Sequence, residues 1–94
     1  MKPAILYEHE GVTADLSKVT RLYPAALIHA AGERASVSLE WAELKEEVIT
    51  LECYVLICDF DPVGEVPVNR IEFHYPTKES LFDAMHEIAR LVNA

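Results

Sequence analysis

The sequence predicts an α+β domain: a mostly antiparallel sheet of five to six strands with one long amphipathic helix at the C-terminus. Three patterns support this class. The stretch Val48–Cys58 is almost wholly apolar, lacks Pro and Gly, and is rich in β-branched residues and leucine, which favours a central strand. Before it, two alternating stretches surround Gly32, as in a β-hairpin. After Thr77, apolar residues recur at three- and four-residue steps, the period of a helix packed on one side.

Side chains alternate between two faces along the predicted central strand. One face is wholly apolar and consists of Ile49, Leu51, Cys53, Val55 and Ile57. The other is mixed and consists of Val48, Thr50, Glu52, Tyr54, Leu56 and Cys58. We expect the apolar face to meet the C-terminal helix, with Cys53 in that core. We expect the mixed face to be partly covered or to lie at an interface.

The predicted hairpin turns at Gly32-Glu33, because Gly at the first of two loop positions suits a type II′ turn. This register places Ile28 opposite Val37. One face then carries Ala26, Ile28, Ala30, Ala35, Val37, Leu39 and Trp41, and the other carries Leu27, His29, Ser36, Ser38 and Glu40. The turn chemistry and the alternation agree with each other.

Four further elements complete the prediction. Ala4–Glu8 reads as a short first strand, and Asp59–Asn69, with two Pro and one Gly, as an irregular loop. Arg70–Tyr75 is a strand with Glu72 and His74 facing outward. Thr77 caps a helix that runs to about residue 92.

Two segments fit either a helix or a strand. In residues 13–23, Asp15 could cap a short helix, but a strand after Ser17 is slightly favoured. In residues 39–47, Ser38 could cap a helix from Leu39. A turn or a single helical turn is favoured there, because a longer helix would not account for the alternation of apolar and polar residues from Ala35 to Trp41.

The order of strands followed by a helix also fits a curled, PH-like half-barrel. A ferredoxin-like sandwich is the alternative if Thr13–Leu22 is helical. No residue motif points to either family. A chain of 94 residues has room for one domain, which we assign to residues 1–94.

The charge excludes some partners. The chain has 16 Asp and Glu against 8 Lys and Arg, a net charge of −8, and its cations are scattered singly. We therefore expect no nucleic-acid binding and no docking on anionic membranes. No apolar run reaches the roughly 20 residues of a membrane span, and no secretory signal is recognisable, so we expect a cytoplasmic protein.

The two cysteines predict free thiols. In one extended strand Cys53 and Cys58 would lie about 16 Å apart, whereas a disulfide needs less than about 7 Å between Cα atoms. Burial would make Cys53 inert, and the neighbouring Asp59 would disfavour a thiolate at Cys58. We predict no catalytic residue and no cofactor.

The histidines give one hypothesis for a ligand site. No two of the four lie at metal-ligand spacing, and neither cysteine has a partner two residues away, so no metal motif is present. Glu72 and His74 alternate on one strand, and His29 lies on the polar face of another. If those strands are neighbours, His29, Glu72 and His74 converge, with Tyr54 nearby. A calcium loop from Asp59 is excluded, because its twelfth position, which should be a bidentate Glu, is an Arg.

Surplus apolar residues give the leading functional hypothesis. Leu27, Tyr54, Leu56 and Phe60 lie on or near the sheet face expected to be polar, and one helix covers only one face. A second layer must come from curling of the sheet or from another subunit. We therefore expect a non-catalytic, acidic protein-interaction module that self-associates as a homodimer or binds a protein partner. The alternative is a small-ligand or metal-binding protein, or a small enzyme, that uses the polar face around His29, Glu72 and His74.

Overall fold

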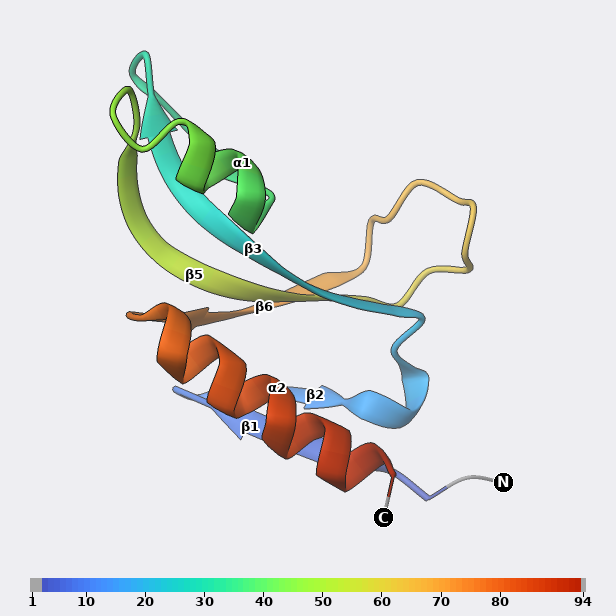
Figure 1. Cartoon of the computed structure of the whole chain (residues 1–94). Helices are drawn as coiled ribbons and strands as arrows, with labels where there is room; N and C mark the ends of the chain where they lie inside the picture. The colour runs from blue at the N-terminus through green and yellow to red at the C-terminus, as the bar shows by residue number, and fades with distance from the viewer. Residues whose placement is uncertain (1–2, 94) are drawn as a thin grey trace.

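The α+β class is confirmed by the structure, a computed structural model that describes residues 3–93 (Figure 1). The elements in chain order are β1 (Leu6–His9), β2 (Val12–Asp15), the 3₁₀ helix η1 (Leu16–Lys18), β3 (Arg21–Ala30), β4 (Glu33–Val37), α1 (Leu39–Leu44), β5 (Thr50–Asp59), β6 (Arg70–Tyr75) and α2 (Lys78–Val92). Every strand pair is antiparallel. The strands form a hairpin, β1-β2, and a four-stranded sheet of order β4-β3-β5-β6, and in residues 3–93 neither closes into a barrel.

Strand β5 is central, as the apolar run predicts, and pairs with β3 on one side and β6 on the other. The pairing with β3 shifts in the middle, since Leu27 faces Cys53 but Ile28 faces Leu51. Glu52 is the extra residue of this β-bulge. The bulge breaks the simple alternation, so that Leu51 and Tyr54 lie on one face of the sheet, while Glu52 and Cys53 contact side chains on the other.

The face of β5 that meets α2 is the mixed one, so the predicted assignment of the faces is wrong. Leu56 and Cys58 lie in the main core with Tyr7, Ala14, Leu16, Phe73, Tyr75, Leu81, Ala84 and Ile88. Cys53 is not in that core. The prediction failed because the polar residues of the mixed face never reach the helix: Thr50 starts the strand and the bulge turns Glu52 away. What remains of that face, Tyr54, Leu56 and Cys58, packs in or against the main core.

The hairpin β3-β4 turns one residue earlier than predicted. The loop residues are Ala31 and Gly32, with φ of +51° and +80°, as in a type I′ turn. Ala30 therefore pairs with Glu33, and Ile28 with Ala35. The residues of β3 and β4 nevertheless lie on the predicted faces, because the partner of Ile28 changes by two residues, from Val37 to Ala35, and such a shift preserves the alternation. Ala26, Ile28, Ala30 and Val37 pack in one apolar cluster, whereas Trp41, predicted on the same strand face, belongs to α1.

Local capping decided the two ambiguous segments. Ser38 caps α1 by accepting a hydrogen bond from the Trp41 N–H at 3.1 Å, so strand alternation stops at Val37 and the favoured short turn is replaced by a six-residue helix. Asp15 caps η1 by accepting from the Ser17 N–H, and β3 follows. Since only three residues of the segment are helical, the ferredoxin-like alternative does not form.

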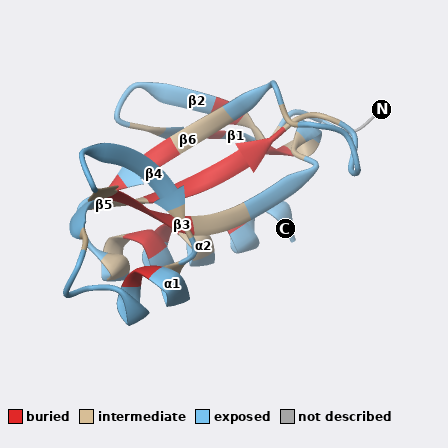
Figure 2. Cartoon of the chain, turned by 90° about the horizontal axis from the view of Figure 1, so that it is seen from above, coloured by how far each residue is buried: buried red, intermediate tan, exposed pale blue. Residues whose placement is uncertain are grey.

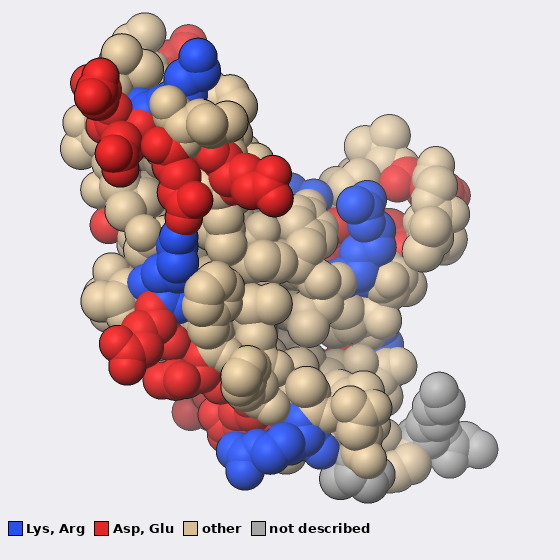
Figure 3. Space-filling model, viewed as in Figure 1, with Lys and Arg blue, Asp and Glu red and all other residues tan. Residues whose placement is uncertain are grey.

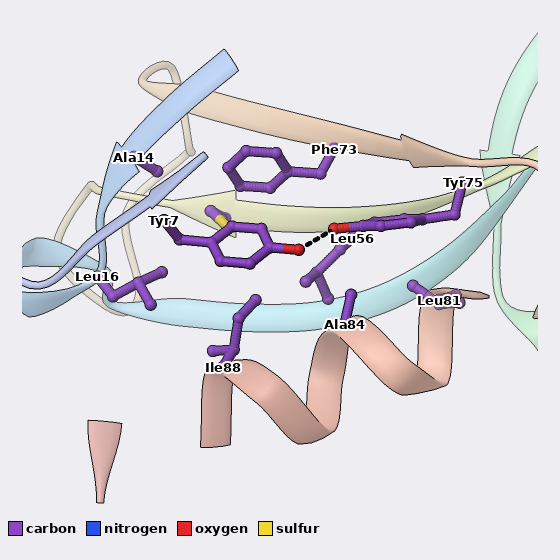
Figure 4. Packing of buried hydrophobic residues seen from close by; sticks show 10 residues of the cluster. Tyr7, Ala14, Leu16, Leu56, Phe73, Tyr75, Leu81, Ala84 and Ile88 are labelled. Atoms are coloured by element: carbon purple, nitrogen blue, oxygen red, sulfur yellow. Dashed lines mark hydrogen bonds between the residues drawn. The ribbon is translucent and has the colours of Figure 1, made fainter. Parts of the chain in front are cut away.

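Helix α2, the hairpin β1-β2 and helix α1 cover one face of the four-stranded sheet. Helix α2 starts at the predicted cap, Thr77, in a capping box with Ser80. The hairpin β1-β2 packs beside it: the Tyr7 and Tyr75 hydroxyls are hydrogen-bonded at 2.7 Å inside the core, and the Tyr7 ring meets Phe73 edge-on at 5.0 Å (Figure 4). Helix α1 covers the same face farther along β3.

The opposite side of this sheet, which we call the open face, has no helix in front of it (Figure 2). Its central side chains are nonetheless buried, and they are Ala25, Leu27, Val55 and Ile57. All four are at most 8% exposed in the single chain, so these residues are covered without a second subunit.

Candidate functional site

The strongest candidate site is a hollow of about 100 Å³ between α1, β5 and the start of α2, which we call the α1 hollow. Its lining residues are Leu39, Ala42, Glu43, Glu46, Ile49, Leu51, Tyr54 and Lys78. The floor is apolar and the rim is charged. This arrangement suits an apolar side chain that is flanked by cations.

Helix geometry and the bulge of β5 together build this site. Leu39, Ala42 and Glu43 are three and four residues apart, so they share one side of α1. The bulge at Glu52 then places both Leu51 and Tyr54 under that side. Without the extra residue, strict alternation would send one of these two side chains to the open face.

The rim of the α1 hollow is acidic. Residues 38–49 contain four Glu and one Lys, which gives a net charge of −3. Glu43 forms an ion pair with Lys78, and this pairing raises the pKa of the Lys78 ammonium. Glu46 lines the hollow as well. In Figure 3, acidic side chains gather over α1 and along α2 on the left of the molecule.

Apolar side chains around α1 add to this surface. Leu44 and Val48 are 81% and 71% exposed, and Trp41 and Leu51 are partly exposed. Leu51 lines the hollow, whereas Trp41 and Leu44 lie on the outer side of the helix. The short helix therefore has apolar side chains on both of its sides, and several of them are exposed.

The open face holds three of the four predicted ligand residues, His29, Glu72 and His74, but it does not bring His29 to the other two, and Tyr54 lies on the opposite face. Strand β5 separates β3 from β6: His29 lies opposite Thr50, and His74 lies opposite Val55. His29 contacts Glu52, which also accepts two hydrogen bonds from Arg34 at 3.0 and 2.7 Å. Arg34, and to a lesser extent His29, lowers the pKa of the Glu52 carboxyl.

His74 belongs to a second polar group on the same face. Its Nδ1 lies 3.6 Å from the Cys53 Sγ, and its Nε2 lies 3.8 Å from a Glu72 oxygen. Burial, followed by the negative charge of Glu52, raises the pKa of the Cys53 thiol, which disfavours the thiolate. Nowhere in residues 3–93 do three His, Cys, Asp or Glu side chains form a group that could hold a metal ion.

The predicted interface residues are dispersed over the fold. Leu27 is buried in the open face, and Leu56 is fully buried beneath α2, so neither offers area to a partner. Phe60 is partly buried against the main core. Tyr54 alone lies at the α1 hollow, on the face opposite to His29 and His74.

The predicted site residues do not include the rim of the α1 hollow. Glu43, Glu46 and Lys78 are absent from them, because a turn or a single helical turn is favoured over a longer helix in residues 39–47. The available signal is the helical spacing of Leu39, Ala42, Glu43 and Glu46 after the capping residue Ser38.

Comparison with known proteins gives no family for this chain: no protein-family model, no curated protein and no solved structure matches it. Within the described part of the chain, no helix is both long and apolar enough to cross a membrane.

Proposed function

We propose that this chain is a non-catalytic, acidic protein-interaction module, cytoplasmic with both thiols reduced, and that its α1 hollow binds a basic segment of a partner protein. One observation carries the proposal: an apolar floor of Leu39, Ala42, Ile49, Leu51 and Tyr54 beneath an acidic rim. Such a surface fits a segment in which a large apolar side chain is flanked by Lys or Arg. The apolar contact supplies affinity, and the rim supplies orientation and a faster encounter.

The charge of the whole chain supports this class of partner. A net charge of −8 attracts basic proteins over a distance of about 8 Å in physiological salt. Around the hollow, Lys78 is already paired with Glu43, so it offers little to an acidic partner. An acidic segment would meet repulsion from Glu46 and from the rest of α1.

Calorimetry with a defined probe tests the proposal. The probe is a synthetic amphipathic peptide of Lys and Leu, about four helical turns long, and its Glu/Leu counterpart is the negative probe. We expect the Lys/Leu peptide to bind and the Glu/Leu peptide not to bind. Leu51→Lys places a cation on the apolar floor, and should weaken binding at least about tenfold.

A charge-matched pair of variants separates this site from general attraction. Glu43→Gln with Glu46→Gln removes two charges at the rim, and Glu79→Gln with Glu87→Gln removes two charges from α2. We expect the rim pair to weaken binding about three- to tenfold and the α2 pair less than about twofold. Equal losses of affinity in the two double variants would mean that the peptide responds only to the net charge of the protein. That result would contradict a binding site at α1.

A second candidate function, small-ligand binding on the open face, is favoured by the contacts of His74 with Cys53 and Glu72. A ligand with a polar group could bridge this group and the buried apolar cluster around Val55. Point changes at His29 and His74 discriminate between the two functions. If neither variant alters the melting-temperature shifts produced by a panel of small ligands, the open face is not a ligand site.

A further inference from the structure

A second apolar surface lies at the end of the molecule away from α1. The loop between β5 and β6 exposes Val63, Val66 and Val68, whose side chains are 75%, 82% and 77% accessible; we call these three residues the loop tip. In Figure 1 the loop projects from the right side of the molecule. Three solvent-exposed valines on one projecting loop form an apolar surface that suits contact with a partner.

The base of this loop is held by hydrogen bonds to Asp61 and Asn69. The Asp61 carboxylate accepts hydrogen bonds from the backbone N–H groups of Val68 and Asn69, at 2.9 and 2.8 Å, and from the Asn69 side chain at 3.1 Å. These bonds, that of the Asn69 backbone foremost, lower the pKa of Asp61. The Phe60 N–H closes the base by donating to the Asn69 carbonyl at 3.0 Å.

The tip is also turned in a defined way. The Glu65 N–H donates to the Pro62 carbonyl at 3.1 Å, and Gly64 between them has φ of +97°, which only glycine adopts without strain. Together with Pro62 and Pro67, this turn limits the conformations of the tip. Little ordering entropy is then lost when the valines are buried by a partner.

A hollow that could receive this loop lies at the same end. It has a volume of about 220 Å³ and is lined by Leu16, Val19, Thr20, Arg21, Leu22, Ile88 and Val92; we call it the terminal hollow. Leu22 and Val92, at 40% and 50% exposure, form its apolar rim. Thr20 links the two surfaces, because it lines the hollow and its hydroxyl donates to the Asp61 carbonyl in the loop.

Charge selects this end for contact between two copies. Two chains of net charge −8 repel each other, so they would meet through their least acidic surface. The acidic α1 is at the other end. At this end Lys18, Arg21 and Arg90, on η1, the start of β3 and the last turn of α2, offset the acidic Asp61 and Glu65 of the loop. In Figure 3 the right side of the molecule shows fewer acidic atoms than the left side.

We infer that the chain forms a two-fold symmetric homodimer in which the loop tip of each copy occupies the terminal hollow of the other. A projecting loop and a receiving hollow at one end make a self-complementary surface, which is what a two-fold axis requires. This dimer goes beyond the proposed function, since it leaves both α1 hollows free. A dimer formed through α1 would instead bring the Glu side chains of the two α1 helices together, and these would repel each other.

Sedimentation velocity over micromolar to near-millimolar concentration tests the dimer. We expect the wild type to pass from monomer to dimer in this range. Val66→Asp removes from each copy a valine that the dimer would bury. Each loss should weaken the association about tenfold, so the dissociation constant should rise about 100-fold. Val92→Asp, on the rim of the hollow, should act in the same way.

Val48→Asp is the matched control, because Val48 is as exposed as the loop tip but lies after α1. It should leave the dimer unchanged. Circular dichroism of all three variants checks that they are folded, as expected for substitutions at exposed positions.

Isotope-filtered NOEs in a mixed labelled and unlabelled sample should connect the Val66 methyl groups of one copy with Ile88 or Val92 of the other. A strict monomer at the highest concentration, or equal effects of Val48→Asp and Val66→Asp, would overturn the proposal.

Discussion

The buried hydrogen bond between Tyr7 and Tyr75 makes a sharp prediction about stability. The two hydroxyls are 2.7 Å apart, and the residues are 7% and 3% exposed, so water cannot replace a missing partner. Tyr7→Phe removes the bond and leaves the Tyr75 hydroxyl buried and unpaired. We expect a loss of about 1–3 kcal/mol in the free energy of unfolding, and a similar loss for Tyr75→Phe.

The double variant is the informative measurement. Tyr7→Phe with Tyr75→Phe removes both hydroxyls, keeps both rings, and leaves no unpaired polar group. Its loss should be smaller than the sum of the single losses by about 1–2 kcal/mol. Urea unfolding followed by far-UV circular dichroism provides all four free energies, since a domain of this size usually unfolds in two states.

Strict additivity of the two single losses would refute this reasoning. It would mean that the hydroxyls do not meet, and hence that the β1-β2 hairpin does not pack on β6 as described. An independent check is spectrophotometric titration of the folded protein. Burial, and then the bond from Tyr7, raises the pKa of Tyr75, so its hydroxyl should stay protonated above pH 10, the ordinary value for tyrosine.

Two further predictions concern the last helix and the thiols. Thr77→Ala should lower the free energy of unfolding by about 1 kcal/mol, because Thr77 caps α2 through the Ser80 N–H, and a melting curve measures this loss. Burial, followed by the charge of Asp59, raises the pKa of Cys58 from 9.0 to about 11. The thiol therefore ionises at a lower pH in the unfolded chain than in the folded one. The contribution of Cys58 to the free energy of unfolding is complete below pH 9 and is lost as the pH rises toward 11. Urea unfolding at pH 8 and pH 10 should show this loss, by roughly 1 kcal/mol, and Cys58→Ala should reduce it; an unchanged loss in that variant would contradict the assignment.

Elements with local signals could be predicted from the sequence. Helix α2 has its cap at Thr77 and an apolar stripe at helical spacing, and both signals lie within the element. Strand β6 alternates without interruption. The apolar face of the β3-β4 hairpin was also predicted, although the turn was misplaced, because Ala31 adopts a positive φ that the sequence does not favour.

Features that depend on pairing could not be predicted. The bulge at Glu52 arises where β5 meets β3, and no residue of β5 alone indicates it. That bulge decided which face of β5 meets α2. The order of strands likewise separated His29 from His74 by placing β5 between them. In α1, strand alternation and helix propensity competed, and the Ser38 cap decided for the helix.

The candidate site was the least predictable part of the molecule. The α1 hollow combines Leu39 and Glu43 from α1 with Leu51 and Tyr54 from β5 and Lys78 from α2. These residues are distant along the chain, and only Tyr54 was expected at a functional surface. The acidic character of that surface was foreseeable from composition, whereas its position depends on the tertiary fold.

The most direct test of the α1 hollow as a binding site is a ¹H–¹⁵N spectrum recorded during titration with the Lys/Leu peptide. We predict chemical-shift changes at Leu39, Ala42, Ile49 and Leu51, with Val55 and Leu27 on the open face unaffected. Saturation with peptide that shifts only the open face, or that shifts no residue at all, would contradict the account.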